Sequence, residues 1–169
     1  MLGAFPPQSQ GVVDYCGELA TALSRRCAVT AIGFSAMYPA FLYPGGKRRI
    51  DPTKAALDGP NLTVHHKLTY YNPLGWIAAA VRTKADVFHV QWWSLALFPI
   101  CFTMMLLMKL RGKRIVITLH NVLPHEKGGT FVIASRLLCA MPEGNWDCPV
   151  IRKSFSCSAR CGTTKPSPT

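Results

Sequence analysis

Two kinds of apolar pattern alternate along the chain. Six apolar residues after the first loop recur every three or four positions, which predicts one face of a helix: Val12, Val13, Cys16, Leu19, Ala20 and Leu23. Four runs rich in apolar and β-branched residues predict strands, at 28–35, 61–68, 85–93 and 114–122. Three further helices are expected, at 72–84, at about 94–109 and at 128–141. A short apolar run at 2–5 is expected to be the remainder of a first strand.

Apolar strands separated by helices favour a parallel sheet that is covered on both faces. We therefore predict an α/β fold, an incomplete Rossmann-like parallel sheet with helices on both faces, over residues 1–141. Residues 142–169 are rich in Ser, Cys and Pro and have no apolar period. This last segment is predicted to be an irregular, disordered tail.

The apolar run Trp92–Met108 allows two interpretations. It reaches the lower length limit of about 17 residues for a membrane-spanning helix. Pro99 and Thr103 lie inside it, and a strand is expected directly before and after it, which favours a crossover helix inside an α/β fold. A peripheral contact with a membrane surface stays open. Four basic residues could make it: Lys109, Arg111, Lys113 and Arg114.

The net charge of the chain restricts the classes of expected binding partner. The chain has 19 Lys and Arg against 8 Asp and Glu, a formal net charge of +11. Such a surplus suits nucleotide phosphates or anionic lipid headgroups. The basic residues come in short groups without interleaved aromatic residues, so nucleic acid is not expected as a partner.

The seven cysteines do not form a metal-binding pattern. No C-x-x-C pair is present, so no metal site and no cofactor is expected. Cys16, Cys27 and Cys101 lie in or beside predicted elements and are expected to pack as core thiols. Because no secretion signal opens the sequence, we expect a cytoplasmic location.

The first loop, residues 6–11, has the position of a phosphate cradle between a strand and a helix N-terminus. Gly11, next to Gln10, would let the backbone approach a ligand closely, or would only permit a tight turn. The Gly-x-Gly-x-x-Gly fingerprint and the Walker lysine are both missing. This argues against a nicotinamide-dependent dehydrogenase and a P-loop ATPase.

A polar cluster follows the last predicted strand and contains His120, Asn121, His125 and Glu126. In open parallel sheets ligands bind at the carboxyl ends of the strands, which makes His120 a candidate site residue. His125 and Glu126 either line the same crevice or end a loop. His89, inside the preceding strand, is expected to be buried with its hydrogen bonds satisfied.

Three segments, in order, resemble the N-terminal half of glycosyltransferases of the family-4 type: "GAFPPQSQGVVDYCGELATALSRR", "ADVFHVQWW" and "RIVITLHNVLPHE". These enzymes have the GT-B architecture of two Rossmann-like domains facing across a cleft, and the resemblance covers about residues 2–140. It implies that Gly11 and its neighbour Gln10 face the donor phosphates and the acceptor. It also implies that His120 is the catalytic histidine of the cleft, with its polar neighbours as further substrate contacts.

The resemblance implies transfer of a sugar from a nucleotide-sugar to a glycan or a lipid-linked acceptor, with retention of configuration and without a metal. In the family a second domain holds the nucleotide-sugar through basic residues and a pair of glutamates, and these 169 residues are not expected to contain it. We therefore expect a fragment that is inactive alone, because half of the electrostatic site for the leaving diphosphate is missing. The alternatives are a non-catalytic nucleotide- or partner-binding module, or a single-span membrane protein.

The reading frame or gene model is expected to depart from the family near Pro142. Sequencing the encoding DNA through the Met141 codon and translating the three forward frames should find a frame that continues with a β-type strand. A second α/β domain carrying paired glutamates should follow it. If every frame stops and the Cys- and Ser-rich tail is confirmed, the chain is a genuine half-domain, and the binding-module alternative is favoured.

Overall fold

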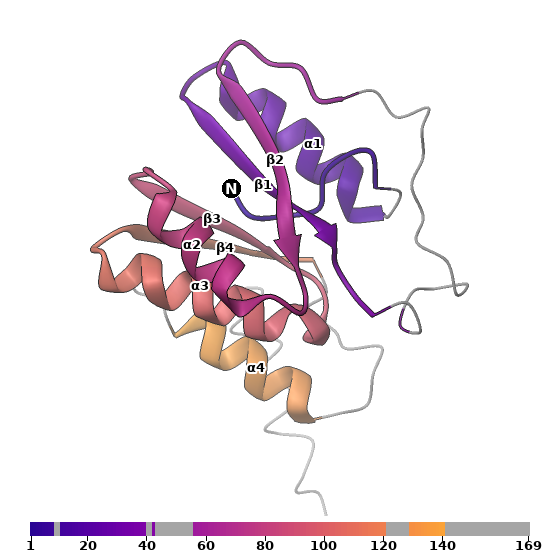
Figure 1. Cartoon of the computed structure of the whole chain (residues 1–169), viewed down its shortest axis with the longest axis vertical. Coiled ribbons are helices and arrows are strands. Elements are labelled where there is room, and N and C mark those ends of the chain that lie inside the picture. Colours follow the sequence, from indigo (N-terminus) through magenta and orange to yellow (C-terminus); the bar gives the residue numbers. More distant parts are fainter. Residues whose placement is uncertain (9–10, 40–41, 43–55, 121–128, 141–169) are drawn as a thin grey trace, which may run out of the picture.

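The computed structural model of the chain describes residues 1–8, 11–39, 42, 56–120 and 129–140. The predicted helices and strands all have counterparts within these ranges, and the α/β class is confirmed (Figure 1). The tail predicted at 142–169 lies outside the described residues. The elements are α1 (Gly11–Ser24), β1 (Val29–Ala36), β2 (Leu62–Thr69), α2 (Pro73–Arg82), β3 (Val87–Trp92), η3 (Leu95–Leu97), α3 (Phe98–Leu110), β4 (Arg114–Leu119) and α4 (Gly129–Cys139).

The N-terminal segment, Met1–Gly3, joins two pairs of parallel strands. β1 pairs with β2 and β3 pairs with β4, each in parallel. Leu2 forms parallel bridges to Ile32 in β1 and to Val90 in β3. Leu2 N donates to His89 O at 2.7 Å, and Ile32 N donates to Met1 O at 2.8 Å. The order across the described strands is therefore β2, β1, N-terminal segment, β3, β4, and the expected short first strand is present in this form.

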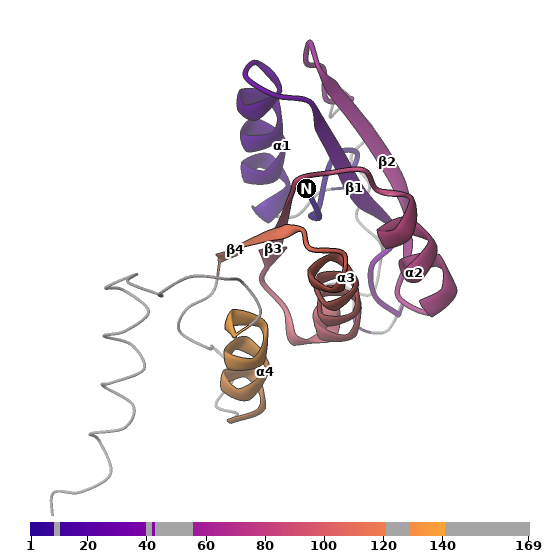
Figure 2. The ribbon, with the colours of Figure 1, turned by 90° about the vertical axis from the view of Figure 1, so that its left-hand side faces the viewer.

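Helices lie on both sides of these strands. α1 lies on one side, and α2 and α3 lie together on the other (Figure 2). Because successive side chains of a strand point to opposite faces, each face has its own core. The smaller core, on the α1 side, includes Phe5, Cys16 and Ala20.

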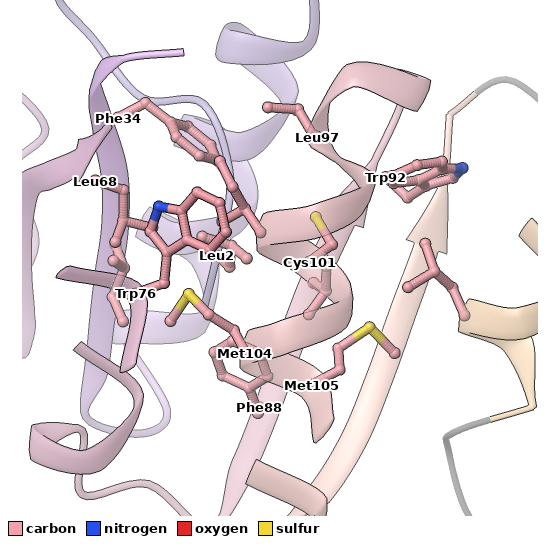
Figure 3. Close-up of a cluster of buried hydrophobic side chains, with 14 of the residues drawn as sticks. Leu2, Phe34, Leu68, Trp76, Phe88, Trp92, Leu97, Cys101, Met104 and Met105 are labelled. Carbon is pink, nitrogen blue, oxygen red and sulfur yellow. The ribbon is translucent and has the colours of Figure 1, made fainter. Parts of the chain in front are cut away.

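The larger core lies chiefly between the strands and the helices α2 and α3. Figure 3 shows side chains from the strands, α2 and α3 gathered there. From α3, five residues are buried: Ile100, Cys101, Met104, Met105 and Met108. The helix connects β3 to β4, so the prediction of a crossover helix in this segment is confirmed. α3 has 13 residues. None of the described helices has both the length and the apolar character to cross a membrane.

Two sequence-based expectations about burial were wrong. Cys16 and Cys101 are buried free thiols as expected, but Cys27 is exposed, because it lies in the turn between α1 and β1. The outer strands are also less covered than predicted. Leu68 in β2 and Ile115 in β4 are buried, while the other residues of both strands are exposed or half-buried, since each strand forms an edge of the described sheet.

The turn between α3 and β4 depends on a glycine. Gly112 has a φ of 68°, in the left-handed region that residues with a Cβ disfavour. Its N donates to Lys109 O at 2.8 Å, and Lys113 N donates to Met108 O at 3.0 Å, which is the pattern of a Schellman motif. The glycine thus ends the helix and starts β4.

Replacing Gly112 by alanine should lower the free energy of unfolding by about 1 kcal/mol, because alanine disfavours a positive φ. Gly11→Ala is the matched control: Gly11 has no positive φ, and a Cβ there would meet nothing within 4 Å. Urea denaturation of both variants measures the difference. Equal losses in the two would contradict this account of Gly112.

Candidate functional site

The polar site lies at the carboxyl ends of β3 and β4. His120 directly follows β4, and its backbone N donates to Trp92 O at 2.9 Å, which continues the ladder between the two strands. β1 and β2 lie on one side of the N-terminal segment, and β3 and β4 lie on the other side. The direction in which successive strands are added to the sheet therefore reverses at this segment. In open parallel sheets, ligands bind outside the carboxyl ends of the strands beside such a reversal of strand order. His120 therefore stands where the sequence analysis expected a site.

Four polar residues of these strands lie on one face of the sheet. His89 and Gln91 are two positions apart in β3, and Thr118 and His120 are two positions apart around the end of β4. Gln91 is paired with Thr118 in the register of the two strands. Because the side-chain period of a strand is two, all four side chains share the face on the α1 side.

These side chains form a hydrogen-bonded chain. His120 Nε2 lies 2.7 Å from Gln91 Oε1, and Gln91 Nε2 lies 3.1 Å from His89 Nε2. His89 Nε2 also lies 2.8 Å from Thr118 Oγ1. Since the amide oxygen of Gln91 only accepts and its NH₂ only donates, His120 donates from Nε2 and His89 accepts at Nε2. This tautomer of His120 leaves Nδ1 as an acceptor.

Gln91 couples the two imidazoles. A 180° turn of its amide would exchange the roles of His89 and His120 together, so their tautomers depend on each other. Gln91 is almost fully buried, with 1% of its surface exposed. A Cβ added to Gly3 would lie 3.2 Å from Gln91 Cγ and 3.1 Å from Cys16 Sγ. The glycine in the N-terminal segment therefore makes room for this amide.

Aromatic side chains surround the His120 ring. Tyr15 from α1 meets it edge to face, with ring centroids 4.9 Å apart and planes at 84°. Trp93, just after β3, lies 6.5 Å from it at 77°. Trp93 Nε1 donates to Tyr38 Oη at 3.0 Å, which links this wall to the chain just after β1. An apolar ring with polar hydroxyl groups beside it is a common surface for binding a sugar ring or another flat polar ligand.

Burial keeps both histidines neutral at pH 7. It lowers the pKa of His120 below the ordinary value of 6.5. Burial also lowers the pKa of His89, and repulsion from the N-terminal ammonium and from the protonated form of His120 lowers it further. A neutral imidazole keeps a lone pair, so His120 is able to accept a hydrogen bond from a ligand hydroxyl.

The first loop contributes a buried amide. Gln8 Nε2 donates to Phe34 O at 2.6 Å, close to the carboxyl end of β1. Gln8 Oε1 is buried and has no hydrogen-bond partner within the described part of the chain. Buried polar atoms are usually paired, so this oxygen is a candidate contact for a ligand donor.

Gly11 is the exposed first residue of α1. Its backbone is helical without a positive φ, so the glycine is not required by a left-handed conformation. A Cβ there would meet nothing within 4 Å, so packing does not require the glycine either. Its contact with a ligand stays a prediction. The other predicted substrate contacts lie outside the described residues: Gln10, Asn121, His125 and Glu126.

Gln91, Thr118 and Tyr15 are members of the site that were not predicted from the sequence. His89 was expected to be buried and satisfied; the ring is hydrogen-bonded as expected but only half-buried. The signal was available in part, because polar residues spaced by two in both adjacent strands indicate a shared face. The spacing could not show that the two strands are neighbours in this register.

A hollow on the other side of α1 is separate from the histidines. It has a volume of about 460 Å³ and lies between Pro6, one side of α1 and Leu57. His120 does not line it, and the hollow is open to solvent, so we place the site at the strand ends. Among the described residues, no group of three or more His, Cys, Asp or Glu side chains is placed to hold a metal ion.

Comparison with known proteins adds no relative. No protein-family model matches the chain, and neither the curated proteins nor the solved structures contain a significant match.

The stability of the protein should fall in acid because of these two histidines. Their pKa values are lower in the folded state, so the unfolded state binds more protons as the pH drops below about 6.5. The free energy of unfolding should therefore decrease between pH 7 and pH 5, and less steeply in the His89→Gln/His120→Gln variant. Denaturant titrations across this range compare the slopes. Equal slopes would contradict the assignment, since all other groups titrate in both proteins.

Proposed function

We propose that this chain is the acceptor-side half of a retaining glycosyltransferase that transfers a sugar from a nucleotide-sugar to a glycan or a lipid-linked acceptor. The observation that carries the proposal is the neutral His120, held by Gln91 at the carboxyl end of β4 beside the reversal of strand order. The three segments that resemble family-4-type enzymes include the parts of the chain that build this site.

The arrangement of the strands supports the proposal. An order with β2 and β1 on one side of the first strand, and β3 and β4 on the other, is that of a Rossmann-like doubly wound sheet. In the GT-B architecture, such a domain turns the carboxyl ends of its strands toward the cleft. His120, Gln91 and the loop with Gln8 would then face the substrates.

His120 would orient the acceptor. With Nε2 engaged by Gln91, Nδ1 is the nitrogen that accepts a hydrogen bond from a sugar hydroxyl. Tyr15, which is 46% exposed, would contact the apolar face of the sugar, while the buried Trp93 packs against the His120 ring. The hydrogen-bonded chain through His89 and Thr118 fixes the ring before the substrate arrives, which reduces the entropy lost on binding.

The proposed partners follow from this assignment. They are a nucleotide-sugar and a glycan or lipid-linked acceptor, without a metal, another cofactor or nucleic acid, in the cytoplasm or at the inner face of its membrane. The donor diphosphate would be held mainly by a second domain. We therefore expect the chain to bind acceptor and to transfer sugar only together with such a domain.

Acceptor binding should be visible at His120. In a titration of the full chain with soluble oligosaccharides, followed by the imidazole signals in NMR, the His120 resonances should shift. His120→Ala should weaken binding about tenfold, the usual effect of losing one hydrogen bond to a ligand. The matched control is His65→Ala, because His65 lies in β2 at the far edge of the described sheet and should leave the affinity unchanged.

Two outcomes would contradict the proposal. Oligosaccharides that leave the His120 signals unmoved, while nucleotides alone shift them, would favour a nucleotide-binding module. Efficient transfer by the purified chain alone would show that no second domain is needed. Restoration of transfer by a family-4-type donor domain, added in trans, would support the proposal.

A further inference from the structure

The outer face of α2 is apolar although it is exposed. Trp76 and Ala80 point into the core, and the opposite face carries Leu74, Ile77 and Val81 at a spacing of three and four residues. Leu74 is 77% exposed and Val81 is 56% exposed. A helix that packs on a protein core and faces water normally has polar residues on its outer side. The outer side of α2 therefore indicates a surface that contacts an apolar partner.

The neighbouring helix α3 also exposes apolar residues. α2 and α3 lie together on the same side of the sheet (Figure 2). The five buried residues of α3 point to the core, and the opposite side exposes Leu106 and Leu110, the latter by 75%. We call the surface formed by Leu74, Ile77, Val81, Leu106 and Leu110 the α2–α3 outer face.

Basic residues border this face at the C-terminal ends of both helices. Between residues 70 and 114 the only acidic residue is Asp86, and Lys113 pairs with it at 3.9 Å. The basic residues of this stretch lie in the last turns of α2 and α3, in the segments that follow them, and at the first residue of β4. They are Arg82, Lys84, Lys109, Arg111, Lys113 and Arg114.

Arg111 shows that the border and the helices form one unit. Its Nη1 donates to the carbonyl oxygens of Ala80 and of Thr83, the latter at 3.1 Å, and so ties the end of α3 to the end of α2. The sequence alone left open a membrane contact through Lys109, Arg111, Lys113 and Arg114. In the structure Arg111 is partly engaged in holding the two helices, and the larger apolar contact lies on their outer face.

We propose that the α2–α3 outer face binds the surface of an anionic lipid bilayer. Both helices would lie in the plane of the interface, with their leucines, Ile77 and Val81 among the acyl chains and the basic border at the phosphates. A bilayer supplies an apolar layer beside a negative one, which complements both parts of this face. A second copy of the chain would also present an apolar surface, but the border of that surface would be positively charged and would not complement the basic border of the first copy. The proposal does not rest on the proposed sugar transfer.

Flotation of the full chain with vesicles tests the proposal. The protein should float with vesicles of phosphatidylcholine and phosphatidylglycerol, and much less with phosphatidylcholine alone. Leu74→Glu/Val81→Glu should abolish flotation. The matched control is Ile133→Glu/Leu137→Glu, an exposed apolar pair on α4 with the same spacing as a helical turn, which should float like the wild type. Circular dichroism should show the same fold in both variants.

The basic border has its own pair of variants. Arg82→Gln/Lys84→Gln should weaken partitioning onto anionic vesicles roughly 30-fold, the effect expected for two basic side chains at such a surface. Arg25→Gln/Arg26→Gln, an exposed basic pair at the end of α1, should change it little. The wild-type affinity should also fall as salt is added.

Three results would overturn the proposal. The first is no flotation of the wild type with anionic vesicles. The second is an equal loss in the α2 and α4 variants. The third is a dimer in analytical ultracentrifugation that Leu74→Glu/Val81→Glu dissociates, because the face would then be a self-association interface.

Discussion

The hydrogen bonds of Met1–Gly3 to both neighbouring strands are the constraint on which the rest of the structure depends. Without them, β1–β2 and β3–β4 would be two separate pairs, and two-stranded sheets have little stability of their own. The same three residues separate the two cores. Leu2 is part of the larger core, on the side of α2 and α3, and Met1 is part of the smaller core, on the side of α1.

The candidate site depends on this segment as well. Gly3 leaves the space that the buried side chain of Gln91 occupies, and Gln91 in turn holds His120. The site therefore consists of common side chains, and neighbouring residues determine the protonation state and the orientation of its two histidines. Burial favours the neutral form of both histidines, and the single amide between them assigns one as donor and the other as acceptor.

The surfaces at the two ends of the strands differ in polarity and charge. The polar site lies at the carboxyl ends of the strands, whereas the basic border lies at the opposite end, where β4 begins. α2 and α3 each have a buried side that packs on the core, and their solvent-exposed side is apolar as well. Tyr71, exposed between β2 and α2, adds an aromatic ring near the carboxyl end of β2. A molecule resting on α2 and α3 would thus keep its strand ends free for a substrate beside the contact surface.

The sequence by itself determined the elements, because apolar spacing of three and four or of two is a local property that survives in the folded chain. It placed α1 and β4 within a few residues, and it put His120 at the end of a strand. It did not determine that β3 and β4 are neighbours in a register that pairs Gln91 with Thr118. That contact joins segments almost thirty residues apart, so it depends on packing and not on local pattern. The role of Gln91, the exposure of β2 and β4 at the edges, and the uncovered apolar side of α2 were decided only by the tertiary structure, since each is a relation between elements rather than a property of one.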